Sequence, residues 1–161
     1  MDTLSASVLR DRKPQIGIVL GSGLGALAER IEGAEALPYS DIPGFPVSTA
    51  PGHKGRFVFG TIGDKEVVLM DGRVHLYEGY TPQQVAMPIS LMRLMGLYTV
   101  LLTNASGGIR RDLHAGDLML LTDHISSLVP SPLRGENDPA LGVRFPDMRH
   151  VYDEDLQRLF R

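Results

Sequence analysis

The segment that most constrains the fold of this chain is an apolar run, residues 16–20, followed at once by the glycine-rich residues 21–25. A short, continuous apolar run predicts a strand buried on both faces, as in the parallel sheets of α/β proteins. Apolar residues then recur at helical spacing, at Leu24, Leu27, Ala28 and Ile31. The order strand, glycine loop, helix indicates an α/β fold.

The rest of the chain continues this alternation, after residues 33–55, which we expect to be irregular. Two strands are predicted at 56–62 and 66–70, joined by a tight turn at Gly63-Asp64. A helix is expected to open at Thr81-Pro82, with Pro88 causing a kink or a late start. Further strands are predicted at 98–102 and 117–125, and a last helix is expected to begin near Tyr152 and to run on at Arg161.

These elements predict an α/β fold with a mixed central sheet flanked by helices, because the hairpin at 56–70 adds antiparallel pairing. The length of 161 residues suits a single domain, and we assign 1–161 to it. Residues 1–13 are predicted to form a short helix or a tail.

Composition excludes several classes of function. The chain has no cysteine, which rules out disulfides and thiolate chemistry, and a net charge of −3, which argues against a nucleic-acid partner. The five histidines form no metal-binding motif, and no apolar run approaches the ~18 residues of a membrane span. We therefore expect a cytoplasmic protein with no metal, no cofactor and no membrane partner.

Three loops fall where ligands of open α/β sheets bind, beyond the carboxyl ends of strands: 21–25, 71–81 and 103–108. Glycines in the first loop let backbone amides approach an anion, and Ser22 adds a hydroxyl donor. Arg73, His75 and Tyr77 are spaced by two, so in an extended segment they point to one side. Arginine suits bidentate phosphate binding, and histidine titrates near neutrality. The amides of the third loop can face the same anion.

Structural readings of the same residues stay open at this point. The glycine loop can be a plain tight turn, and the basic residues of 51–56 can be a solvated turn. A dinucleotide-binding fingerprint is also formally present, with Gly21, Gly23 and Ala26 followed by Asp41. Asp41, however, lies in a proline-rich stretch and not at the end of a second apolar strand, which argues against that interpretation.

Six segments in register resemble the trimeric class of purine nucleoside phosphorylases. They are 18–25 (IVLGSGLG), 51–56 (PGHKGR), 72–80 (GRVHLYEGY), 103–108 (TNASGG), 116–125 (GDLMLLTDHI) and 132–146, which opens with PLRG and closes with RFP. The resemblance runs from about residue 14 to the end of the sequence. It is weaker toward the related methylthioadenosine phosphorylases, notably at 51–56 and 73–80.

The resemblance implies reversible phosphorolysis of a purine (deoxy)ribonucleoside, giving the free base and (deoxy)ribose 1-phosphate, in a homotrimer. Phosphate would be bound by Ser22, Arg73 and His75 together with the Ala105 amide, and His53 would cover it. The sugar would contact Tyr77, and Phe145 would reach into the sugar site of a neighbouring subunit. His75 and Tyr77 are thus the expected catalytic residues, and inorganic phosphate is a substrate rather than a cofactor.

Subunits of that family are considerably longer than this chain, so we expect the sequence to correspond to their N-terminal portion. The family's purine-binding Glu and Asn lie beyond Arg161 and cannot be assigned here. The activity of the 161-residue chain and its choice between 6-oxo and 6-amino purines therefore stay open. The alternatives are a non-catalytic phosphate-binding fragment and a methylthioadenosine phosphorylase-like enzyme.

Overall fold

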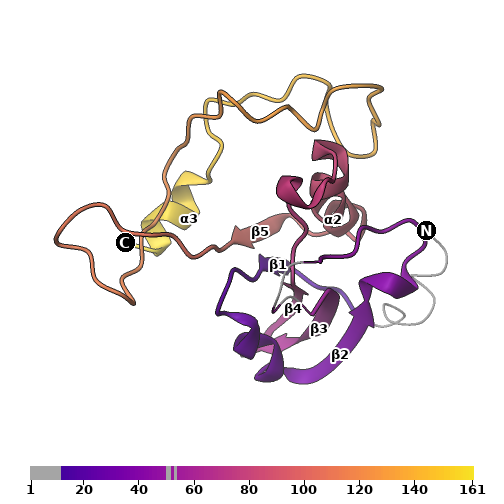
Figure 1. The fold of residues 1–161 in the computed structure, drawn as a ribbon. Helices are drawn as coiled ribbons and strands as arrows, with labels where there is room; N and C mark the ends of the chain where they lie inside the picture. Colours follow the sequence, from indigo (N-terminus) through magenta and orange to yellow (C-terminus); the bar gives the residue numbers. More distant parts are fainter. Residues whose placement is uncertain (1–11, 50–51, 53) are drawn as a thin grey trace. The chain divides into compact units, whose positions relative to one another are not determined.

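A computed structural model describes residues 12–49, 52 and 54–161 (Figure 1). The chain divides into two compact units, Met1–Ala105 and Ser106–Arg161. Most of the predicted helix or tail at 1–13 lies outside the described residues, and the assignment of 1–161 to one domain stays a prediction.

The first unit is built on a five-stranded mixed sheet, which confirms the predicted fold class (Figure 1). The strands, in chain order, are β1 (Ile16–Val19), β2 (Glu32–Pro38), β3 (Arg56–Ile62), β4 (Lys65–Asp71) and β5 (Thr99–Leu102). Their order in the sheet is β2-β3-β4-β1-β5. β1 runs parallel to β4 and β5, whereas β2, β3 and β4 are antiparallel neighbours. The carboxyl ends of β1, β4 and β5 consequently meet at one edge.

Side chains of the hairpin alternate between two apolar clusters, as the period of two in a strand requires. Phe57 and Phe59 of β3 join Val68 and Met70 of β4 in one cluster. Val58, Val67 and Leu69 point to the opposite face and form the second cluster with Ala28 and Ile31, among others. Both faces of the sheet are therefore covered at the hairpin of β3 and β4.

The segment after β1 differs from the prediction. In place of an α-helix from Leu24, the chain forms a short 3-10 helix, η1 (Gly25–Glu29). Ala28 in this turn and Ile31 just after it are buried, whereas Leu24 and Leu27 are exposed. A dinucleotide-binding site requires an α-helix directly after the glycine loop, and this chain has a short 3-10 helix there.

The prediction of an irregular segment at 33–55 is wrong in part, because β2 pairs with β3 there. β2 has the sequence EGAEALP, without β-branched residues, and is mostly exposed at the edge of the sheet. It forms a strand because it pairs with β3, and its own sequence does not show the alternation of apolar and polar residues by which a strand is predicted. Asp41 lies just after it, in the 3-10 turn η2 (Tyr39–Asp41).

Helix α2 (Pro82–Leu94) begins where predicted, with Thr81 as its N-cap and Gln84 completing a capping box. It starts at Pro82 and continues through Pro88, so the alternative of a late start is wrong. Met92 is fully buried in the first apolar cluster, which places α2 against one face of the sheet.

The second unit consists mostly of exposed loop and ends in helix α3 (Glu154–Leu159) (Figure 1). Asp153 caps this helix by accepting a hydrogen bond of 2.8 Å from the Leu156 amide, so α3 begins close to the predicted Tyr152 but ends before Arg161. The strand predicted at 117–125 is not formed, because no other described strand forms a ladder with it.

Candidate functional site

The first and third predicted loops lie against each other at the carboxyl ends of β1 and β5. A Cβ atom added to Gly21 would lie 2.6 Å from Asn104 Cα and 2.8 Å from the Thr103 carbonyl oxygen. A side chain at position 21 would therefore collide with backbone, which gives this glycine a steric reason. The Gly21 amide donates to Thr103 Oγ1 over 2.9 Å.

Arg73, after β4, connects the second loop to this junction. Its Nη1 donates to the Thr103 carbonyl oxygen over 2.9 Å, and its Nε donates to His75 Nε2 over 3.2 Å. Both contacts are partly buried. The guanidinium and the imidazole predicted from the sequence are thus brought together, beside the end of β5.

His75 is oriented by Glu78, a residue for which the sequence pattern predicts no role. The His75 amide and its ring Nδ1 both lie 2.8 Å from Glu78 Oε1. Because Nε2 accepts from Arg73, the hydrogen-bond pattern assigns the ring proton to Nδ1, which then donates to the carboxylate. Glu78 thereby fixes the imidazole orientation.

The Glu78 carboxylate is itself almost enclosed, with 2% of its side chain exposed. Burial raises the pKa of Glu78, but hydrogen bonds from Thr49 and His75 outweigh this and lower the pKa to about 2. Oε2 accepts from the Thr49 amide (2.5 Å) and hydroxyl (2.8 Å). The carboxylate is therefore ionised at neutral pH and ties the 48–49 segment to the second loop.

A partly buried ion pair lies at the end of β4. Asp71 is 3% exposed and accepts from Arg56 Nε over 2.9 Å. Nearby, the buried Tyr39 hydroxyl donates to the Gly72 carbonyl over 2.7 Å, and burial, reinforced by the Asp71 charge, raises the pKa of Tyr39. Arg56 was predicted as the last residue of a basic turn and the first of a strand, without an ion-pair partner. Its partner Asp71, at the end of an apolar strand, was the signal that could have revealed the pair.

The remaining predicted site residues have different surroundings. Ser22 is exposed on the turn next to Gly21, and Ala105 is exposed just past the Gly21–Asn104 contact. Tyr77 stacks on the His75 ring, with centroids 4.7 Å apart and planes 18° apart, and is 75% exposed. Phe145 belongs to the second unit, where it is exposed beside the Arg144 guanidinium. His53 lies outside the described residues.

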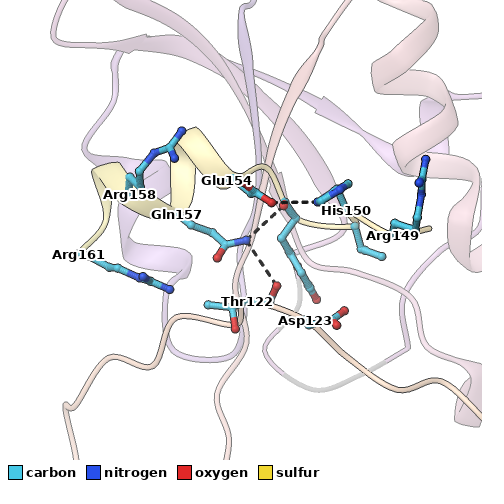
Figure 2. Close-up of a pocket in the computed structure, with 10 residues that line it drawn as sticks. Thr122, Asp123, Arg149, His150, Glu154, Gln157, Arg158 and Arg161 are labelled. Atoms are coloured by element: carbon cyan, nitrogen blue, oxygen red, sulfur yellow. Dashed lines mark hydrogen bonds and ion pairs between the residues drawn. The ribbon is translucent and has the colours of Figure 1, made fainter. Parts of the chain in front are cut away.

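A pocket of about 350 Å³ lies elsewhere, within the second unit (Figure 2). Its residues include Thr122, Arg149, His150, Glu154 and Gln157, and none of the predicted site residues. His150 pairs with Glu154 over 2.9 Å, and Gln157 Nε2 donates to the carbonyls of Tyr152 and Thr122 (Figure 2). We place the candidate site instead in the first unit, where Gly21, Arg73 and Thr103 are brought together.

Over residues 12–49, 52 and 54–161, no group of three or more His, Cys, Asp or Glu side chains is placed to hold a metal ion. The same residues include no helix long and apolar enough to cross a membrane.

Comparison with known proteins agrees with the family that the motifs suggested. Purine nucleoside phosphorylase 1 of Geobacillus stearothermophilus is 51% identical over 146 residues, which cover 91% of this chain and 53% of that protein. Purine nucleoside phosphorylase of Bos taurus is 44% identical over 153 residues, which cover 92% of this chain and 52% of that protein. The chain thus spans about half the length of these relatives.

Solved structures give the same result. Isoform 2 of purine nucleoside phosphorylase from Schistosoma mansoni, in complex with cytosine and ribose-1-phosphate, matches with a TM-score of 0.82 and 42% identity. The match covers 98% of this chain and 56% of that one. Residues 15–161 match the phosphorylase superfamily. This chain therefore belongs to the phosphorylase superfamily and is similar to about half of a purine nucleoside phosphorylase.

Proposed function

We propose that this chain supplies the phosphate site and part of the sugar site for the phosphorolysis of purine (deoxy)ribonucleosides. The observation that carries the proposal is the position of Arg73, which donates to the Thr103 carbonyl of the third predicted loop and to His75 in its own loop. The relatives that match the chain are named purine nucleoside phosphorylases.

The phosphate would be held by Ser22, Arg73, His75 and the Ala105 amide, with His53 as its cover. Arginine contributes a permanent charge and a planar donor fork, and the serine hydroxyl and backbone amide contribute neutral donors. This set supports binding of an oxyanion at neutral pH. It would also hold the phosphate close to a sugar that becomes positively charged in the transition state.

In the reaction, a phosphate oxygen forms a bond to the anomeric carbon while the bond from that carbon to the purine nitrogen breaks. The bonding electrons leave with the base, which takes up a proton, and the products are the free purine and (deoxy)ribose 1-phosphate. His75 and Tyr77 would act closest to the reacting atoms. The exposed face of Tyr77 is available to pack on a sugar, since its other face stacks on His75.

The partner chain in this proposal is a second copy of the protein. Phe145 would enter the sugar site of a neighbouring subunit in a homotrimer, and the exposure of its ring in the single chain supports this. A cytoplasmic location and activity without a cofactor complete the proposal.

A second candidate function is non-catalytic phosphate binding. It is favoured by one observation, that the chain spans about half the length of its matched relatives. The two functions share the same phosphate residues and differ in whether a nucleoside is cleaved.

The test is a pair of measurements on the 161-residue chain. Cleavage of inosine is followed with and without inorganic phosphate, and binding of inorganic phosphate is measured by calorimetry. Hypoxanthine that forms only with phosphate supports the first function, whereas phosphate binding without cleavage selects the second. Cleavage of 5′-methylthioadenosine in preference to inosine would point to the related enzyme class.

Two arginine variants make the test specific. Arg73→Met should abolish phosphate binding, because it removes the charge and the donor fork. Arg30→Met is the matched control, since Arg30 is exposed on the same unit and has no side-chain partner among the described residues. A folded wild-type chain that does not bind phosphate, or equal binding by both variants, would refute the proposed site.

A further inference from the structure

We propose that Thr103 is a positioning residue of the phosphate site, whose hydroxyl sets the glycine loop and whose carbonyl sets Arg73. This inference rests on the proposed function, because it concerns the same site. Thr103 is the first residue after β5, and the sequence pattern predicts no role for its side chain.

Three groups of Thr103 are engaged by three different segments. Its hydroxyl donates to the Val19 carbonyl over 2.8 Å and accepts from the Gly21 amide over 2.9 Å. Its own amide donates to the same Val19 carbonyl over 3.1 Å. Its carbonyl accepts from Arg73 Nη1 over 2.9 Å. One residue therefore connects the ends of β1 and β5 to the second predicted loop.

The hydroxyl also decides which loop amides remain for an anion. The Gly21 amide is used by Thr103, and the Leu24 amide donates to the Gly21 carbonyl over 3.1 Å. Between them, the amides of Ser22 and Gly23 have no protein partner in the described part of the chain, and both residues are exposed. The donors that the turn offers are those of Ser22 and Gly23, oriented by the anchored residues on either side.

The position of Gly21 leaves no room for another way to anchor the loop. It already lies against the backbone of Thr103 and Asn104, and it is buried. Without the hydroxyl, the Gly21 amide loses its partner where water has little access, so the turn must shift to satisfy it. Valine has nearly the shape of threonine and removes only this hydroxyl, whereas serine keeps it.

The experiment compares the wild-type chain with Thr103→Val, Thr103→Ser and Thr61→Val. Thr61 lies on β3, and its side chain has no hydrogen bond among the described residues, so it controls for a generic threonine-to-valine change. The two readouts are the dissociation constant for inorganic phosphate and, in phosphate-free buffer, the hydrogen-exchange rate of the Gly21 amide. Near-ultraviolet circular dichroism verifies that each variant is folded.

We expect Thr103→Val to weaken phosphate binding and to speed Gly21 exchange, each by about five- to tenfold, the range that corresponds to a net hydrogen bond of about 1–1.4 kcal/mol. Thr103→Ser should restore both to within about threefold, and Thr61→Val should change neither. Unchanged phosphate binding in folded Thr103→Val would overturn the positioning role, even if its melting temperature fell.

Failure of the proposed function gives a different result. If the wild-type chain binds no phosphate, the phosphate site itself is refuted, while Gly21 exchange still reports on Thr103. Faster exchange in Thr103→Val, reversed in Thr103→Ser, would then support the anchoring of the loop. Equal exchange in all four proteins would overturn it.

Discussion

Replacing Glu78 with glutamine should show how much the negative charge of this side chain, as opposed to its size, contributes to the stability of the fold. The carboxylate accepts hydrogen bonds through both oxygens, Oε1 from His75 and Oε2 from Thr49. Glutamine has nearly the same size, but only one of its two terminal groups accepts. One set of donors must then face an NH2 group inside a region where only 2% of the Glu78 side chain is exposed.

The magnitude follows from the pKa of Glu78, which the fold lowers from 4.5 to about 2. The folded-state pKa is depressed, so the ionised carboxylate stabilises the fold above pH 4.5, and that contribution is lost as the pH falls toward 2. At about 1.4 kcal/mol for each pH unit, the contribution at neutral pH is about 3 kcal/mol. Glu78→Gln should be less stable than the wild type by roughly this amount at pH 7.

The assay is urea unfolding of both proteins at pH 7, 5, 4 and 3. The difference in the free energy of unfolding should be largest at pH 7 and should shrink steadily below pH 4.5. Glu32→Gln is the control, because Glu32 is exposed at the edge strand β2 and its side chain has no hydrogen bond among the described residues. A difference that stays constant down to pH 3, or a Glu78→Gln protein as stable as Glu32→Gln, would refute the reasoning.

Three further predictions concern the same molecule. Gly21→Ala should destabilise the fold by about 1–3 kcal/mol in denaturant unfolding, since its Cβ meets backbone at 2.6 Å; Gly107→Ala, with no atom within 4 Å, should not. Asp71→Asn should cost about 1–3 kcal/mol by weakening the pair with Arg56, and an effect no larger than that of Asp64→Asn on the exposed turn would contradict this. The second unit leaves large apolar side chains more than nine-tenths exposed at Ile109, Leu118, Ile125 and Leu128. The chain should therefore bind a hydrophobic dye and form oligomers that light scattering detects. A monomer that does not bind the dye would count against this.

Much of the first unit could be predicted because its local patterns are strong. Short apolar runs predict β1 and β5, and two such runs around a glycine turn predict the hairpin of β3 and β4. Thr81, Pro82 and Gln84 mark the start of α2. The edge strand β2 could not be found this way, because it forms by pairing with β3 rather than through its own residues. The opposite error occurred at 117–125, where a strand-like sequence has no strand paired with it in the described chain.

The candidate site divides in the same manner. Motif and spacing selected Ser22, Arg73, His75 and Tyr77, because their chemistry is recognisable within a few residues of the chain. Glu78 and Thr103 lie inside two of the quoted segments, 72–80 and 103–108, but nothing in their spacing along the chain shows which groups they contact. Glu78 matters because the fold encloses its carboxylate among Thr49 and His75 donors, and Thr103 because parallel pairing of β1 and β5 brings it to Gly21.

The sequence by itself therefore determined the α/β class, the hairpin and the identity of the cationic and glycine-rich loops. Only the tertiary structure decided which of these groups meet and what holds them. The physical reason is distance along the chain, because secondary-structure propensity and hydrophobic periodicity reflect only a few neighbouring residues. The contact between Gly21 and Thr103 instead joins positions 82 residues apart and exists only once the sheet has formed.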